Sequence, residues 1–333
     1  MTTDSGEHKT AYRDLCQAEP SIPVFSQAWW LDATAGPHDW DVVLNREGDK
    51  INAALPFFVR QRFGQKILTT PSLTPSLGPW LCPYTGKASK RIAREKTLLT
   101  ALFAALPEHG LYQQNWAVGH NNWQPLYWMG FDQTTGYTHR LHDITDIDAI
   151  WTSLDQRTRN DIRKARDRNG VAVRPATSTA EFLQVNNKTY ERQNMSPPYG
   201  QAFVEKVVEA AKARGAVELL VAQGEDGNLH AGAMILYDND AAYYLMGGGD
   251  MEFRNSGAAS LLLWEAIVAS RERVMAFDFE GSMIESIERF FRGFGGDLTP
   301  YLHVRKANTL AARALLLAQD FKKRRVQMKG KNG

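Results

Sequence analysis

The chain has 333 residues, of which 43% are hydrophobic and 23% charged, a composition typical of a globular protein rather than a disordered or fibrous one. The formal net charge of +2 gives no reason to expect nucleic acid or a membrane as the main partner. The two cysteines, Cys16 and Cys82, lie far apart and without paired spacing, so the sequence suggests neither a disulfide framework nor a zinc site. The first residues lack an apolar signal core, and no apolar stretch is long enough to span a membrane, so we expect a cytoplasmic location.

A chain of this length exceeds what one hydrophobic core usually fills, so two domains are expected. In the first half, a helix starts at Ser26, and strands at 41–44 and 51–59 flank a turn typical of a hairpin. Residues 69–86 are rich in Pro, Gly, Ser and Thr and predict a long loop. A helix over 89–106 and strands at 112–118 and 137–141 follow, so this half mixes α and β structure.

Apolar residues at spacings of three and four predict one helix over 146–168, ended by Asn169-Gly170. We place the domain boundary at its start, which gives domains at 1–145 and 146–320 and a basic tail at 321–333. The second half then reads as a series of strands and helices in the order β-α-α-β-β-β-α-β. The predicted strands are 171–174, 217–223, 230–237, 241–247 and 274–280, and the predicted helices are 179–192, 201–214 and 256–272.

One segment of the second half predicts an anion site. The strand containing Tyr243 and Tyr244 leads into Arg254-Asn255-Ser256-Gly257-Ala258-Ala259 and then into a helix expected to be amphipathic. Free N–H groups and the helix dipole at such a helix start favour an anion such as the pyrophosphate of coenzyme A. Gly257 and Ala259 would allow close approach, Ser256 could cap the helix, and Arg254 supplies charge. The alternative is that Gly257 only starts a tightly packed helix.

These residues resemble the Arg/Gln-x-x-Gly-x-Gly/Ala signature of the GNAT superfamily, and the order of elements resembles the GNAT plan. Residues 277–306, from Phe277-Asp-Phe-Glu280 onward, and the helix Arg159-Asn160-Asp-Ile162-Arg163-Lys164-Ala165 are similar to Fem-type and related double-GNAT acyltransferases. The resemblance implies an α+β fold of two tandem GNAT-like domains, each a mixed, mainly antiparallel sheet flanked by helices. Many Fem-type members carry a lysine where this chain has Phe291, so no role of that lysine can be carried across.

The resemblance implies an N-acyltransferase that moves an acyl group from acyl-CoA (such as acetyl-CoA) to an amine of a small molecule, for example an amino sugar or amino acid. It assigns the donor to the second domain and leaves the first, degenerate domain for the acceptor cleft. The alternatives are an aminoacyl-tRNA-dependent Fem-type transferase acting on a peptidoglycan precursor, the one case with a nucleic acid partner, and a non-catalytic binding module. The residues expected to bind the donor are Met246, Gly247, Arg254, Asn255, Ser256, Gly257, Ala258 and Ala259.

Three side chains are candidates for the chemistry. Strand alternation places Asp278 and Glu280 on one face at a strand end, where a carboxylate raised in pKa by burial could accept the proton of the amine. Glu280 is preferred because it is nearer the end, and the alternative is an ion pair with Arg289 or Arg292. Tyr244 is the candidate to protonate the departing thiolate, and packing in the sheet is the alternative.

Candidates for acceptor binding are Trp30, Tyr199 and Arg292, with core packing or solvation as their alternatives. His139 and His142 point to opposite faces of a strand and lack a third ligand, so we expect no metal site. The cationic run at 157–168 and the basic tail could contact RNA or anionic lipid, but ordinary solvated charge is the favoured interpretation.

Overall fold

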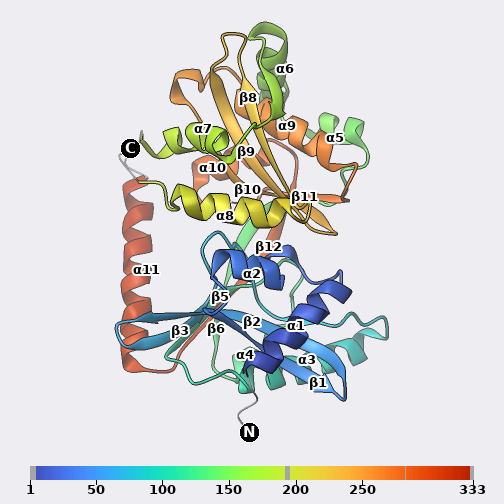
Figure 1. The fold of residues 1–333 in the computed structure, drawn as a ribbon, viewed down its shortest axis with the longest axis vertical. Helices are drawn as coiled ribbons and strands as arrows, with labels where there is room; N and C mark the ends of the chain where they lie inside the picture. Colours follow the sequence, from blue (N-terminus) through green and yellow to red (C-terminus); the bar gives the residue numbers. More distant parts are fainter. Residues whose placement is uncertain (1–4, 192–195, 282, 331–333) are drawn as a thin grey trace. The chain divides into compact units, whose positions relative to one another are not determined.

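The computed structural model describes residues 5–191, 196–281 and 283–330, with side chains at all of these except 5, 286 and 323–330. Arg192 at the end of the predicted helix 179–192, Ser282 within the segment 277–306 and residues 331–333 of the basic tail lie outside the described part. The chain forms two compact units, one of residues 1–135 with 301–333 and one of residues 136–300 (Figure 1). The division differs from the sequence-based one because the last strand and helix pack with the N-terminal unit.

Unit 1 is built on a mixed sheet in the order β1-β2-β3-β5-β12, with β4 beside β2. The predicted hairpin is confirmed by β1 and β2, which pair antiparallel with Trp40 opposite Phe58. His303–Ala307 of β12 pair with β5, which ties the C-terminal strand to this unit. The strands are β1 (Trp40–Glu47), β2 (Lys50–Arg62), β3 (Gln65–Thr69), β4 (Trp80–Leu81), β5 (Leu111–Asn115) and β12 (Asp297–Ala307), and the helices are α1 (Ser5–Ala18), α2 (Ala28–Thr34), α3 (Ala88–Ala104), α4 (Gln124–Trp128) and α11 (Leu310–Gly330).

The strands of unit 2 lie in the order β6-β11-β10-β9-β8-β7, and the described pairs are antiparallel except for β10 and β11. The predicted order of elements is confirmed, and so is the α+β fold class. The strands are β6 (Asp132–Leu141), β7 (Ala172–Pro175), β8 (Val217–Gln223), β9 (Leu229–Tyr237), β10 (Ala241–Gly249) and β11 (Ala276–Asp278), and the helices are α5 (Ile147–Ser153), α6 (Gln156–Arg163), α7 (Thr179–Glu191), α8 (Gln201–Lys212), α9 (Ala258–Ser270) and α10 (Glu285–Arg292).

The single helix predicted over 146–168 is wrong, because the structure breaks it into α5, α6 and a π-helical turn at Lys164–Arg168. Leu154 leaves the helical conformation with ψ 143°, and the N–H of Asp155 donates to the carbonyl of Gly293 instead of to the preceding turn. A tertiary hydrogen bond therefore replaces a helical one, which the local spacing of apolar residues cannot reveal.

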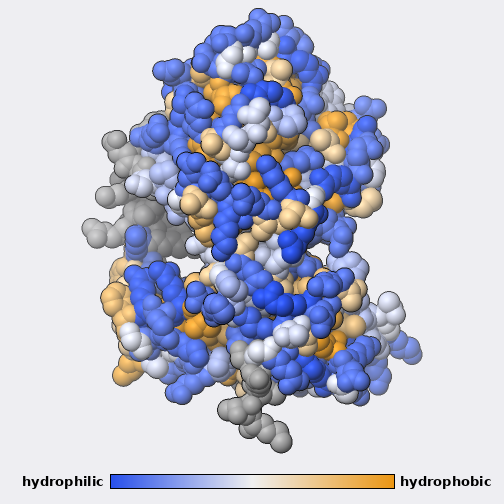
Figure 2. All heavy atoms as spheres, in the orientation of Figure 1, coloured by the Kyte–Doolittle hydropathy of each residue, from blue (hydrophilic) through white to orange (hydrophobic). Residues whose placement is uncertain are grey.

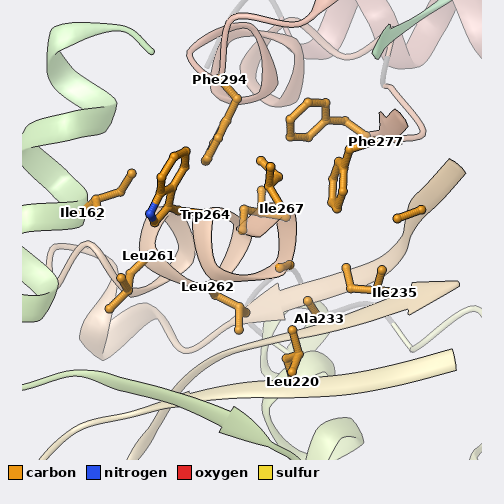
Figure 3. Close-up of a cluster of buried hydrophobic side chains, with 14 of the residues drawn as sticks. Ile162, Leu220, Ala233, Ile235, Leu261, Leu262, Trp264, Ile267, Phe277 and Phe294 are labelled. Carbon is orange, nitrogen blue, oxygen red and sulfur yellow. The ribbon is translucent and has the colours of Figure 1, made fainter. Parts of the chain in front are cut away.

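Helix α9 forms the centre of the unit 2 core. The helix expected to be amphipathic is instead buried on nearly all sides, at nine of its thirteen positions. Figure 3 shows Leu261, Trp264 and Ile267 between Phe277 and Phe294 on one side and the sheet residues Leu220, Ala233 and Ile235 on the other. Helix α7 covers the opposite face of the sheet, where Phe182 and Val185 pack over Gly232.

The surface differs from this core. The face drawn in Figure 2 carries mostly hydrophilic residues, with hydrophobic ones in small groups. Within the described residues, no helix is both long and apolar enough to cross a bilayer.

Candidate active site

Strand β10 loses one of its two neighbours partway along its length. Its parallel pairing with β11 covers only Ala241–Tyr243, opposite Ala276–Asp278, whereas its antiparallel pairing with β9 continues to Gly249. The register with β9 shifts between Tyr244 and Met246, so Leu245 is an extra, bulged residue. Beyond Tyr243, the β11 side of β10 therefore has no strand partner among the described residues, which leaves backbone N–H and C=O groups for a ligand.

The glycines that end β10 are required by close packing. A Cβ atom on Gly247 would overlap the hydroxyl of Tyr244, so the absence of a side chain lets this tyrosine lie along its own strand. A Cβ atom on Gly248 would come within 2.8 Å of the carbonyl oxygen of Asn186 on α7. The Gly247-Gly248-Gly249 run thus brings α7 and Tyr244 against the strand end.

A short loop then connects β10 to α9. Asp250 caps the 3₁₀ turn Met251–Phe253 by accepting from the N–H of Glu252, and it also forms an ion pair with Lys188 of α7. These contacts hold the pKa of Asp250 below its usual range despite the opposing effect of its burial. We call residues 250–257 the donor loop because they include the predicted donor residues Arg254, Asn255, Ser256 and Gly257. Its start is anchored to the strand and to α7.

Gly257 is the N-cap of α9 and adopts a left-handed conformation with φ 83°. A Cβ atom there would overlap the carbonyl oxygen of Asp161 on α6, so the glycine allows α6 to pack against the start of α9. The N–H of Ala258 donates to Ser256 Oγ, at 3.2 Å. No described residue accepts from the N–H of Ala259 or Ser260, and Ala259 is exposed.

An open pocket of about 470 Å³ adjoins this helix start. Two residues that follow α6 hold the loop before α9. Lys164 Nζ donates to the Asn255 carbonyl at 2.6 Å, and Asn169 Nδ2 donates to the Ser256 carbonyl at 2.9 Å. The pocket is lined by Lys164, Asn169, Gly224, Glu225, Asp226, His230, Glu252, Phe253, Asn255 and Ser256. Arg254 and Asn255 are exposed, and the Arg254 guanidinium has no ion-pair partner among the described residues.

At the end of β11, Asp278 and Glu280 have different surroundings. Asp278 is 2% exposed and accepts from the hydroxyl of Thr138, from the N–H of Glu280 at 2.9 Å and from Arg140 at 3.5 Å. Burial raises its pKa, and these three donors oppose that shift. Asp278 is therefore the partner of Arg140, rather than of Arg289 or Arg292, which pair with Glu285 and Glu288 on α10.

Glu280 follows with a backbone φ of 49°, a conformation that glutamate rarely adopts. Burial of its carboxyl group raises its pKa well above the usual range, the charge of Asp278 adds to this shift, and Arg140 offsets part of it. No described cation lies within ion-pair distance of its carboxylate. A strained backbone and a carboxyl group with a raised pKa are features typical of functional sites.

The two neighbouring tyrosines point to opposite faces, as expected. The Tyr243 hydroxyl donates to Asp238 at 2.9 Å, beside Arg140 and Asp278, and is part of a buried polar network. Tyr244 packs against the core that contains α9 and lies 5.7 Å, ring centre to ring centre, from Phe291. Burial raises the pKa of Tyr244, so it keeps its proton at neutral pH.

The three acceptor candidates have different surroundings. Trp30 lies in the core of unit 1, is 0% exposed and donates its indole N–H to Thr74, which fits packing rather than binding. Tyr199 is half-buried beside Phe203 before α8, and Arg292 is exposed and pairs with Glu288 at 3.2 Å. His139 and His142 have different environments. His139 is buried near Glu288, and His142 is exposed near Asp297.

Residues that sequence reasoning missed support this site from β6 and from the end of α6. The Thr138 hydroxyl donates to Asp278 and accepts from the N–H of Gly281 at 2.8 Å. Arg140 also pairs with Asp240. Thr138 is separated from Asp278 by 140 positions, so no local pattern could link them. Lys164, by contrast, belongs to the cationic run at 157–168 that the sequence analysis identified, although it was not assigned to this site.

Comparison with known proteins agrees with this geometry. A family model described as an acetyltransferase (GNAT) domain matches residues 153–290. None of the curated proteins matches the chain in sequence. The solved structure of FemX shares 14% identity, covers 91% of this chain and 96% of its own, and gives a TM-score of 0.64.

Two further structures share the fold. A tandem GNAT protein from the clavulanic acid biosynthesis pathway is 11% identical, with 91% of this chain and 96% of that chain covered and a TM-score of 0.53. The C-terminal domain of a putative lysylphosphatidylglycerol synthetase from Agrobacterium fabrum is 13% identical, with 95% and 97% covered and a TM-score of 0.56. Residues 153–290 are thus a GNAT domain. The chain as a whole shares its fold with FemX and with a tandem GNAT protein, which is the fold that its sequence predicted.

Proposed function

We propose that this protein is a cytoplasmic N-acyltransferase that transfers an acyl group from acyl-CoA to the amine of a small molecule, such as an amino sugar or amino acid. One observation carries the proposal: β10 parts from β11 after Tyr243 and leads directly into the open helix start at Gly257. The parted strands offer a slot for an extended thioester arm, and the helix start offers N–H groups for its phosphates. The GNAT domain match over residues 153–290 supports the reaction class.

In this proposal each donor residue has a defined task. The thioester carbonyl accepts from backbone N–H groups at the bulge of β10, next to Met246, where negative charge develops as the amine attacks. The pyrophosphate lies at the N–H groups of Ala259 and Ser260, beside Arg254 and Lys164. The close packing behind Gly247 and Gly257 keeps both subsites rigid.

Glu280 is the proposed general base. The substrate ammonium gives one proton to the Glu280 carboxylate, the amine nitrogen forms the new C–N bond as the C–S bond of the thioester breaks, and the nitrogen then releases its second proton to solvent. Tyr244 is the proposed acid that gives its proton to the departing thiolate, and solvent restores the tyrosine. Tyr199 and Arg292, both accessible in unit 2, remain the proposed acceptor contacts, with the arginine suited to a carboxylate or phosphate.

A second candidate is an aminoacyl-tRNA-dependent transferase of the Fem type. The fold likeness to FemX favours it, because that structure gives a TM-score of 0.64 over 91% of this chain. Phe291 argues against a Fem-type reaction, because many Fem-type proteins carry a lysine at this position. Here the side chain is instead 5% exposed and packs against Tyr244 and Phe279. A non-catalytic binding module would keep the fold and bind neither donor.

The test is a thermal-shift series with acetyl-, succinyl- and longer acyl-CoA, and with aminoacyl-tRNA. A ligand at about 100 times its Kd should stabilise the native state by about 2.7 kcal/mol. Ala259→Glu places a negative charge at the exposed helix start, where it suits the helix dipole but repels phosphate. We expect this variant to melt no lower than the wild type and to lose the CoA-dependent shift.

Ala202→Glu is the matched control. Ala202 is exposed and is the second residue of α8, as Ala259 is of α9, and glycine precedes both helices. The control should keep the full shift. A shift with aminoacyl-tRNA alone would favour the Fem-type reaction, and no shift with any donor would overturn the enzymatic proposal.

A further inference from the structure

The C-terminal helix α11 is fixed to unit 1 by one face. Ala312 and Leu316 are buried against Ile67 of β3 and Leu111 of β5. At its start, Thr309 accepts from the N–H of Ala312 at 3.1 Å and donates to Gln65 at 2.6 Å. Farther along, Asp320 pairs with Arg305 of β12 at 2.9 Å. The helix is thus part of the folded unit over its first three turns.

The outer face of the same helix is also apolar. Leu310, Leu317 and Phe321 are 81%, 59% and 66% exposed. Leu317 and Phe321 lie seven and eleven residues after Leu310, so the three side chains fall within an arc of roughly 40° around the helix. Ala314 and Ala318 are exposed between them. We call these five residues the outer stripe of α11, and it lacks a partner among the described residues.

Positive charge is concentrated in this helix. Residues 310–330 contain six basic residues, Arg313, Lys322, Lys323, Arg324, Arg325 and Lys329, and one acidic residue, Asp320, for a net charge of +5. Removing these from the totals of 39 basic and 37 acidic residues leaves 33 and 36, so the rest of the chain is −3. The small overall charge is therefore the sum of a cationic helix and a remainder with a small negative charge.

The chemistry of the stripe distinguishes between possible occupants. RNA would match the cations but gains little from exposed leucines. A second copy of the helix would pair along positions 310, 314, 317 and 321, but the same spacing continues to Arg324, which puts a charge in the seam and repels an equally basic helix. An anionic bilayer surface accommodates both features, because acyl chains take up the apolar stripe and headgroups attract the following cations.

We propose that α11 is a surface anchor that lies in the interface of an anionic lipid bilayer through Leu310, Leu317 and Phe321, with Lys322 on the headgroups and the net charge of +5 of residues 310–330 attracting the helix to the anionic surface. The proposal gives the basic tail a function in membrane binding, whereas the sequence alone favoured ordinary solvated charge for it. The inference is independent of acyl transfer, since it rests on unit 1 alone.

The experiment is flotation of the full chain with vesicles of phosphatidylcholine alone and of phosphatidylcholine mixed with phosphatidylglycerol. The wild type should float with the anionic vesicles and not with the neutral ones, and high salt should release it. Leu317→Ser with Phe321→Ser, and separately Lys322→Glu with Lys323→Glu, should each weaken binding on the order of tenfold or more, with unchanged melting.

The controls are matched in chemistry and location within unit 1. Phe63→Ser removes another exposed aromatic side chain, 79% accessible, and Lys87→Glu with Lys90→Glu makes the same charge change on exposed residues at the start of α3. Both should bind like the wild type. Equal binding to neutral vesicles, loss of binding in the controls, or no binding at all would overturn the proposal. So would a dimer that the Leu317 and Phe321 variant dissociates, or retention on RNA in place of vesicles.

Discussion

Glu280 holds its left-handed backbone conformation because two neighbouring N–H groups are fixed. Its own N–H donates to Asp278, and the N–H of Gly281 donates to Thr138. A Cβ atom on Gly281 would lie 2.5 Å from the Cα of Thr138, so the chain is pressed against β6 at this point. Strain of this kind costs roughly 1–3 kcal/mol and persists only where surrounding contacts determine the conformation.

The pKa of Glu280 gives a prediction for stability against pH. The raised pKa means that the fold favours the protonated form, so the contribution of this residue to the free energy of unfolding is greatest below the usual carboxyl range and falls as pH rises through the folded-state pKa. Glu280→Gln keeps the shape without the charge. Denaturant unfolding should show the variant gaining stability relative to the wild type as pH rises above the usual carboxyl range.

The same variant tests the chemistry. If Glu280 is the base, turnover should fall by about 10²- to 10⁴-fold with little change in donor binding. A variant that keeps both full turnover and the wild-type pH profile would exclude Glu280 as the base. A stability gap that does not vary with pH would contradict the raised pKa.

At the scale of elements, the contact between α6 and the start of α9 determines the shape of the donor loop. Gly257 and Gly200 are both helix N-caps, but only Gly257 has a positive φ and a neighbouring backbone where its Cβ would lie. Gly257→Ala should therefore destabilise by about 2–4 kcal/mol, through strain and overlap with Asp161. Gly200→Ala meets open space and should change stability by only a few tenths of a kcal/mol.

Unfolding of the two variants in urea provides the comparison. Equal stability of the two would mean that α6 can move away from α9, and the packing role of Gly257 would be wrong. This packing role also explains why a larger substitution at Gly257 is a poor test of donor binding: it would alter the fold before it altered the phosphate site.

The elements around the donor loop were predictable from the sequence because each depends on neighbouring residues. Alternating residues predict strand β10, Gly257 marks the end of the loop, and the apolar run after it predicts helix α9. The break at Leu154 was not predictable, because it depends on a hydrogen bond from Asp155 to Gly293. The Arg140 and Thr138 contacts of Asp278 were missed for the same reason, since a single sequence contains no sign of which distant strands pair.

At the scale of the whole molecule, each unit has a separate core. The core of unit 2 is built around α9, and unit 1 has its own clusters around Phe103 and Trp40. All contacts described for the donor loop, from α6, α7 and the β8–β9 turn, come from residues 136–300. The residues predicted to bind the donor therefore all lie in unit 2.

This separation predicts where a bound donor slows hydrogen exchange. Saturating acyl-CoA should protect the amides of residues 244–260 and the segments that pack on them, by up to about 2.7 kcal/mol at 100 times the Kd where exchange requires release of the ligand. The amides of β1, β2 and β5 in unit 1 should exchange as in the free protein. The Ala259→Glu variant should show no protection in either unit. Uniform protection of both units would mean that they unfold as one cooperative body, and the absence of any effect at 244–260 would place the donor elsewhere.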